Sequence, residues 1–245
     1  MKHFRPRLSR RAFWVLCALL VCLRLALTGF QQAYIWVGGA PLDDELMFRA
    51  ANHITAGQWL GAYDYLTLSK AMFFPVWLAL LHALPLPYLI SGAALWCGAA
   101  LLAAFAFSTL WRKKDPAQGR VLTLGLFAAL AFLPSSWAAY TLRVYRDNIF
   151  PALCLYFFAG MAGMALRAVF TPEKPLWPWL AAAGAGLACG YLDREDAGLF
   201  LLPFAAAATV IVAVVLAGKR RWKALAAQVI PYVMLGVGVL TFCTL

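Results

Sequence analysis

The sequence predicts an all-α integral membrane protein with about seven transmembrane helices. Hydrophobic residues make up 64% of the chain and charged residues only 13%, with a mean hydropathy of +0.77, which is outside the range of soluble domains. Several continuous apolar runs approach or exceed the roughly 20 residues that a helix needs to cross a bilayer. These runs lack the alternation of apolar and polar residues found in barrel strands, so helices are the expected spanning elements.

The apolar runs define the predicted spans in chain order. The spans are residues 12–30, 87–110, 121–139, 149–169, 177–191, 199–217 and 225–245. A further apolar run at 72–84 is too short to cross, and a crossing there would invert every later loop. We therefore expect it to lie on the outer surface of the membrane. The last run is apolar to the final residue, so we expect residues 1–245 to be a single transmembrane domain from the N-terminal part of a longer protein.

The charges are divided between alternate loops. Most of the 21 basic residues precede the first span or follow the second, fourth and sixth spans, and these loops are cytoplasmic by the positive-inside rule. All of the 10 acidic residues except Asp115 and Glu173 fall in the opposite loops. The net charge of +11 therefore reflects topology and not nucleic-acid binding. We expect a plasma (bacterial inner) membrane protein with a cytoplasmic N-terminus and its chemistry on the outer face.

The first span and the cysteines carry no sign of processing or of a metal site. Arg24 interrupts the first span and no small-x-small cleavage site precedes the loop, so we expect an uncleaved anchor. All six cysteines lie in predicted spans, where they act as small apolar side chains. No Cys/His spacing typical of a metal site occurs, and His53 and His82 are isolated.

The first outer loop, residues 31–86, contains the segment PLDDELMFRAANHITAGQW. Its pattern predicts a helix that starts after Pro41 with Asp43 or Asp44 as the N-cap residue, runs to about Ala56 and is closed by Gly57. One face is apolar at helical spacing, which predicts an amphipathic helix on the outer leaflet. The apolar residues are Leu46, Met47, Ala50, Ala51 and Ile54, and the residues facing away are Glu45, Arg49, Asn52 and His53. Asp43 and Asp44 either cap this helix or, with its N-terminus, hold an acceptor, a metal or a phosphate.

The second outer segment is RVYRDNIFP, in which Arg143 and Arg146 lie three residues apart and Asp147 precedes the next span. Two arginines at this spacing can face one way and bind a phosphate. Alternatively, they extend to the membrane interface beside Tyr140 and Tyr145 as part of an aromatic belt.

The third outer segment is YLDREDAGLFLLP, which places four consecutive charges between two spans. These are Asp193, Arg194, Glu195 and Asp196. Such a cluster is costly beside a span unless it is solvated, paired or functional. The alternative to a functional cluster is a solvated turn in which Asp196 caps the next helix.

Four segments, taken in order, resemble the N-terminal part of the C-type (GT-C) polytopic glycosyltransferases. They are DDELMFRAANHITAGQW, YDYLTLSKAMFFP, RVYRDN and REDAGLFLLP. The closest likeness is to the branch of the protein O-mannosyltransferases and aminoarabinose transferases. The resemblance implies a GT-C-like fold with outer-face juxtamembrane helices. It also implies transfer of a sugar from a polyprenyl-phosphate donor to a glycan, lipid or protein acceptor on the outer face.

The resemblance further implies roles for individual residues. Asp44 and Glu45 match the family's acidic pair, which supplies the general base or a metal ligand, with Asp43 as the alternative. Lys70 would bind the donor phosphate, although KAMFFP departs from the family's tighter Lys-Pro pattern. The remaining candidates are Arg143 and Arg146 for the phosphate, Asp147 and residues 193–196 for the acceptor or a metal, and Asp44 with Asp147 for a divalent cation.

Two other classes of function stay open at this point. A transporter or flippase for a lipid-linked or anionic solute would be expected to show broken helices and charges at mid-bilayer, and only Arg24 lies inside a predicted span. The third class is a non-catalytic membrane fragment or scaffold that binds a partner through its juxtamembrane helix.

Overall fold

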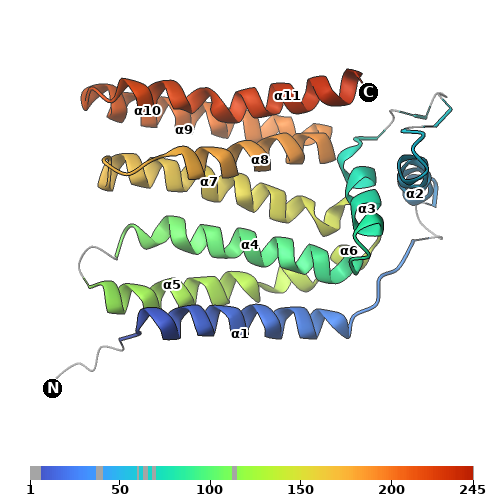
Figure 1. The fold of residues 1–245 in the computed structure, drawn as a ribbon, viewed down its shortest axis with the longest axis horizontal. Helices are drawn as coiled ribbons and strands as arrows, with labels where there is room; N and C mark the ends of the chain where they lie inside the picture. Colours follow the sequence, from blue (N-terminus) through green and yellow to red (C-terminus); the bar gives the residue numbers. More distant parts are fainter. Residues whose placement is uncertain are drawn as a thin grey trace.

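The computed structural model describes residues 7–36, 41–59, 61–62, 66–67, 70–111 and 115–244. Figure 1 shows long helices lying side by side, with two helices across one end. The long helices are α1 (Arg10–Gly29), α4 (Tyr88–Ser108), α5 (Pro116–Ala131), α7 (Phe150–Phe170), α8 (Trp177–Asp193), α9 (Gly198–Gly218) and α11 (Ile230–Thr244), which follows the short α10 (Trp222–Ala226). No strand forms within the described part of the chain, which confirms the all-α class.

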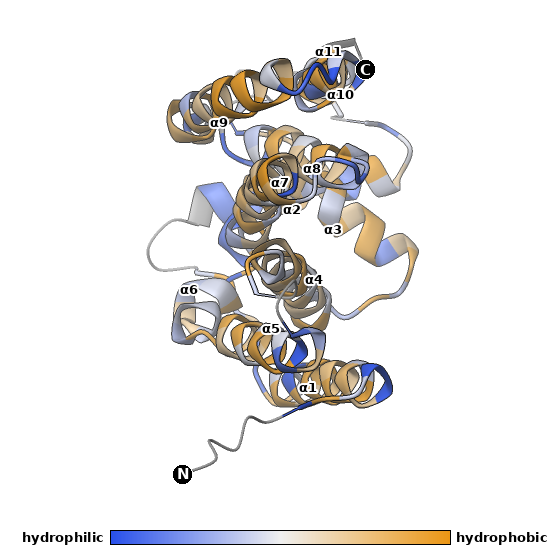
Figure 2. Ribbon diagram, turned by 90° about the vertical axis from the view of Figure 1, so that its left-hand side faces the viewer, coloured by the Kyte–Doolittle hydropathy of each residue, from blue (hydrophilic) through white to orange (hydrophobic). Residues whose placement is uncertain are grey.

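The long helices carry apolar side chains on their outer surfaces. Val15, Leu19, Val210 and Val214 are all more than half exposed, and Figure 2 shows the apolar colour running along the long helices. Exposed apolar surface of this extent requires a lipid environment. The protein is therefore membrane-embedded.

Five helical segments are long and apolar enough to span a bilayer. They are Arg10–Gly29, Tyr88–Ser108, Phe150–Phe170, Gly198–Gly218 and the continuous rod Trp222–Phe242. The other two predicted spans correspond to α5 and α8, which have only 16 and 17 residues. Helix length alone thus supports five spans and not the predicted seven, although α5 and α8 pack antiparallel to their neighbours in the same layer.

The predicted boundaries of the α5 span were wrong at both ends. The helix begins at Pro116, ahead of the apolar run, because the Asp115 carboxylate accepts the N–H groups of Ala117 at 2.9 Å and Gln118 at 3.2 Å. It ends at Ala131, and a 3₁₀ turn, Pro134–Trp137, takes over. A hydropathy profile shows neither the helix cap at Asp115 nor the turn at Pro134, because the first depends on hydrogen bonding and the second on proline.

Glycines allow α7 and α8 to pack in close backbone contact. A Cβ atom at Gly160 would lie 2.5 Å from the backbone nitrogen of Ala183, and one at Gly186 would collide with the backbone of Phe157. Small residues at such crossings are typical of membrane helices. Phe157 and Leu180 are fully buried in the core that results.

Two helices, α2 (Pro41–Thr55) and α3 (Phe73–Ala83), lie across one end of the layer (Figure 1). The position of α3 agrees with the expectation that residues 72–84 do not cross the membrane. The short elements α6 (Ala139–Leu142), η2 (Arg146–Asn148) and η3 (Glu195–Ala197) are at the same end. The α7–α8 and α9–α10 connections are at the opposite end, as are the last residues of α4 and the first residues of α5.

The first predicted amphipathic helix, α2, forms as expected at its C-terminus but not at its N-terminus. Gly57 has a φ of 73°, and its N–H and that of Gln58 bond to the carbonyls of Ile54 and His53 at 3.0 and 2.9 Å. This is the paired bonding of a Schellman end. Asp43 and Asp44 lie inside the first turn of a helix that begins at Pro41, so neither is the capping residue that was considered.

Candidate functional site

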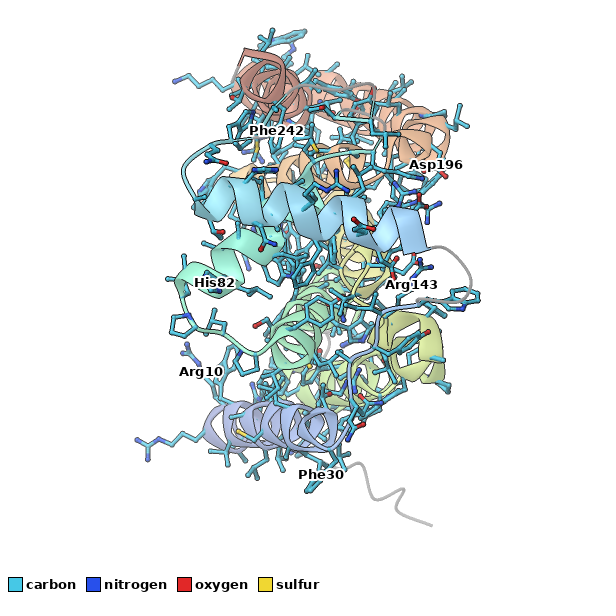
Figure 3. All side chains as sticks on the ribbon, turned by 90° about the vertical axis from the view of Figure 1, so that its right-hand side faces the viewer. Arg10, Phe30, His82, Arg143, Asp196 and Phe242 are labelled. Carbon is cyan, nitrogen blue, oxygen red and sulfur yellow. The ribbon has the colours of Figure 1, made fainter. Side chains whose placement is uncertain are left out.

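The three charged outer segments meet in one network at the end of the layer that carries α2. An ion pair joins Asp44 of the first segment to Arg143 of the second, and another joins Asp147 of the second to Arg194 of the third. Figure 3 looks onto this end, where Arg143 and Asp196 lie on either side of the N-terminal end of α2. The predicted grouping of the three segments is therefore present in the fold.

Asp44 is the buried centre of the first link. Its Oδ2 accepts the Nε–H of Arg143 at 3.0 Å and the backbone N–H of Trp36 at 3.0 Å, and its Oδ1 accepts the Nη2–H of Arg143. The Asp44 side chain is 1% exposed. Hydrogen bonding to Asp44 raises the pKa of Arg143, so the guanidinium remains charged. Both oxygens of Asp44 are thus occupied, and the carboxylate ties α2 to the 143 segment.

A short piece of extended backbone holds this pair in place. The Tyr34 N–H donates to the carbonyl of Leu142 at 3.1 Å, and the Val144 N–H donates to the carbonyl of Tyr34 at 2.9 Å. This pairing brings the chain that follows α1 alongside Arg143. The N–H of Trp36 consequently points at the Asp44 carboxylate.

Two tyrosines that were not among the predicted site residues organise the second segment. The Tyr88 hydroxyl donates to the carbonyl of Arg143 at 2.8 Å and accepts the N–H of Tyr145 at 3.3 Å. The guanidinium groups of Arg143 and Arg146 lie 4.5 and 5.2 Å from the centre of the Tyr145 ring. Burial raises the pKa of Tyr145, so its hydroxyl is a donor at neutral pH. An aromatic residue between two arginines was the available signal, since such rings attract cations.

Asp43 has a different environment from its neighbour. Its Oδ2 lies 3.0 Å from Lys70 Nζ and accepts the Tyr145 hydroxyl at 3.4 Å. The side chains of Asp43 and Lys70 are 35% and 27% exposed. Both groups of this pair are therefore accessible, in contrast to the Asp44–Arg143 pair.

Lys70 also lines a cavity of about 180 Å³ between α2 and α3. Arg49 and His53, one helical turn apart on α2, line the same cavity together with the apolar Met47 and Pro75. The sequence reasoning treated His53 as isolated and missed both residues. Their spacing of four on one helix was the available signal, because such residues share a face.

The His53 ring is held at the cavity by two neighbours. Its Nδ1 lies 3.0 Å from Gln58 Oε1, in the turn that follows α2. Gly61 has a φ of +76°, and a Cβ atom there would lie 2.7 Å from the imidazole ring. Glycine is required at this position both by its backbone conformation and by the close approach of the ring.

The third segment binds to the second and not to the cavity. Arg194 donates to both Asp196 oxygens at 3.1 and 3.0 Å and to Asp147 Oδ1 at 3.3 Å, and the bond from Arg194 lowers the pKa of Asp196. Asp196 does not cap α9, because the cap residue is Ala197. Arg146 Nη1 donates to the carbonyl of Asp193, whose side chain is fully buried. The side chain of Glu195 lies outside the described part of the chain.

The residues predicted to bind phosphate or a metal therefore form separate ion pairs and do not converge on one site. Of the three predicted phosphate ligands, only Lys70 lines the cavity between α2 and α3. Glu45 pairs with the exposed Arg49 at 2.9 Å, away from the buried network.

The arrangement does not fit a divalent cation held by Asp44 and Asp147. Each of these carboxylates bonds to a different arginine, and no group of three His, Cys, Asp or Glu residues that could hold a metal occurs among the described residues. Ca²⁺ and Mg²⁺ are held by oxygen ligands from carboxylates, carbonyls and water, and neither Asp44 oxygen is free to be such a ligand.

Comparison with known proteins identifies no similar protein or family. No family model matches the chain, and the comparisons with curated proteins and with solved structures give no match.

Proposed function

We propose that the chain is a membrane glycosyltransferase that moves a sugar from a polyprenyl-phosphate donor to an acceptor at the end carrying α2 and α3. In this proposal all seven long helical segments cross the membrane, the N-terminus is cytoplasmic, and the site faces outward from a bacterial inner membrane. The basic residues at the opposite ends of the helices support this orientation.

The observation that carries the proposal is the Asp43–Lys70 pair beside the cavity between α2 and α3. A carboxylate and an ammonium group lie 3.0 Å apart at an accessible position, and Arg49 and His53 line the same cavity as Lys70. Glycosyl transfer from a lipid phosphate needs a carboxylate that accepts the proton of the acceptor hydroxyl. It also needs cations that neutralise the leaving phosphate.

The proposed step can be written with these residues. The acceptor hydroxyl oxygen bonds to the anomeric carbon of the sugar while the bond from that carbon to the phosphate oxygen breaks. The phosphate leaves with the electron pair towards Lys70 and Arg49, and the hydroxyl proton passes to Asp43. Inversion at the sugar carbon is expected from the resemblance to the family.

This assignment differs from the one that the resemblance implied for Asp44. By the resemblance, Asp44 belongs to the acidic pair that supplies the general base or a metal ligand, yet in this fold both its oxygens are bonded and its side chain is almost completely buried. We therefore propose Asp43 as the base and Asp44 as a positioning residue that fixes the start of α2.

The test is release of sugar from a radiolabelled mixture of polyprenyl-phosphate sugars by the purified chain. We expect turnover by the wild type, a loss of about 10² to 10⁴-fold in Asp43→Asn, and no change on addition of a chelator. Glu173→Gln removes an exposed carboxylate from the opposite end and should keep wild-type turnover. Equal turnover in Asp43→Asn and wild type would overturn the assignment. Solute flux into vesicles without sugar release would favour the transporter.

A further inference from the structure

Arg24 is a buried charge inside the first spanning helix, and the described hydrogen-bond partners of its side chain are neutral groups. Its Nη1 donates to Thr28 Oγ1 at 3.1 Å, its Nη2 donates to the carbonyl of Ser136 at 2.8 Å, and its guanidinium lies 3.4 Å from the ring centre of Trp137. The residue is 3% exposed. Within the described part of the chain, no carboxylate forms an ion pair with it. An arginine at membrane depth without an opposite charge marks a functional site by default.

Arg24 lines a cavity of about 40 Å³ where α1, α4 and the 135–148 segment meet. This volume holds roughly three water-sized groups. The lining is rich in polar side chains, which include Gln31, Ser135, Tyr140 and Asn148. The cavity can therefore hold a small polar group.

Within the described part of the chain, two buried polar atoms of the lining residues have no hydrogen-bond partner. One is the Nε–H of Arg24, a cationic donor, and the other is Oδ1 of Asn148, an acceptor. The Asn148 amide is oriented by its Nδ2, which donates to the carbonyl of Thr141 at 2.8 Å. A ligand that satisfies both atoms needs an anionic oxygen for Arg24 and a hydroxyl for Asn148.

We propose that this cavity binds a phosphate group that carries a neighbouring hydroxyl, the chemistry of a phosphatidylglycerol head group or of hydrogen phosphate. The phosphate supplies the negative charge that the described neighbours of Arg24 do not supply. Arg24 lies five residues before the end of α1, which corresponds to roughly 7.5 Å along the helix. This depth is within reach of a lipid phosphate at the boundary between head groups and hydrocarbon.

The site is separate from the one proposed for glycosyl transfer. Neither Asp43 nor Lys70 lines this cavity, and Arg24 does not line the cavity between α2 and α3. Either proposal can fail without the other. A purely structural role for Arg24, as a tie between α1 and the Ser136–Trp137 turn, predicts a water-filled cavity with no preference for anionic lipid.

The test measures binding of phosphatidylglycerol, phosphatidylcholine and inorganic phosphate to the purified chain in neutral detergent. Native mass spectrometry reports bound lipid, and the midpoint of thermal unfolding reports all three ligands. We expect phosphatidylglycerol to bind at least tenfold more tightly than phosphatidylcholine. Protection by inorganic phosphate as well would identify the phosphate group as sufficient, and protection by phosphatidylglycerol alone would identify the lipid as the source.

Three variants complete the design. Arg24→Gln should reduce binding of phosphatidylglycerol to the phosphatidylcholine level, whereas Arg167→Gln, which removes an arginine near the end of α7, should leave it unchanged. Asn148→Asp supplies a carboxylate to the same cavity and should abolish the preference while Arg24 is intact. This variant keeps the test decisive if Arg24→Gln does not fold. Equal binding of the two lipids by wild type, or an unchanged preference in Asn148→Asp, would overturn the proposal.

Discussion

Asp43 and Asp44 are adjacent in the sequence but lie in opposite environments. A step of one residue turns a helix by about 100°, so neighbouring side chains in the first turn of α2 face different partners. Asp44 meets the buried Arg143, and Asp43 meets the accessible Lys70. The run of acidic residues predicted a site correctly as a group, but it could not assign one role to each residue.

The first residue-scale prediction concerns the stability contributed by Asp44. Asp44→Asn leaves Arg143 buried without a counter-charge, and breaking such a pair costs about 3–5 kcal/mol. The free energy of unfolding in micelles measures this loss. Glu45→Gln, which breaks an exposed pair one turn apart on the same helix, should cost less than about 0.5 kcal/mol. Equal losses in the two variants would show that the buried link does not hold α2.

The second residue-scale prediction concerns acid. The bond from Arg194 lowers the folded-state pKa of Asp196, so this pair stabilises the fold above the unfolded value of about 3.9 and loses that contribution as pH falls through the folded pKa. Because Asp196 is largely exposed, we expect the contribution to be below about 1 kcal/mol. Thermal unfolding between neutral pH and pH 3 should show wild type and Asp196→Asn converging in acid. A difference that grows in acid would contradict the sign.

At the scale of elements, local signals predicted α2 better than they predicted α5. The helix α2 ends just before Gly57, because this glycine adopts a positive φ. A glycine at this position can be recognised from the sequence. The start of α5 depends on whether Asp115 accepts backbone N–H groups, which an apolar-run count does not measure. Similarly, the backbone of Tyr34 pairs with residues 142–144, which are far away in the sequence. No local sequence pattern can predict such a pairing.

The element-scale prediction concerns the contact between α7 and α8. Gly160→Ala would place a methyl group against the backbone of α8, and overpacking of this kind costs about 1–3 kcal/mol. Gly125→Ala in α5 meets nothing within 4 Å and should be neutral or stabilising by up to about 1 kcal/mol, because alanine favours helices. The two variants differ from wild type by the same methyl group. A comparison of their unfolding midpoints isolates the packing cost, and similar midpoints would contradict close packing at Gly160.

At the scale of the whole molecule, the composition predicted an all-α membrane protein. The distribution of charged residues along the chain predicted their separation between the two ends. The seven-span count depends on α5 and α8, whose lengths of about 24 and 26 Å fall below the roughly 30 Å of a hydrocarbon core. Single-sequence hydropathy cannot show whether the turns beside these helices complete a crossing. It also could not show that Arg24 and Asn148 line one cavity, because their segments meet only in the folded layer.

The whole-molecule prediction tests the topology directly. In a background without cysteines, Asn52→Cys on α2 should react with a membrane-impermeant maleimide in intact cells, because that end carries the acidic loops. Glu173→Cys, in the α7–α8 turn, should react only after the membrane is permeabilised. Both sites are exposed, so access to the compartment decides the result. Labelling of both under the same condition would overturn the proposed arrangement.

The link between Asp44 and Arg143 also sets an order of events during synthesis. The two residues are 99 positions apart, and at about 5–20 residues per second Arg143 is made roughly 5–20 s after Asp44. Throughout that interval α3, α4 and α5 are made while the carboxylate that will be buried has no arginine partner. We therefore expect α2 to dock only after α4 and α5 have been made.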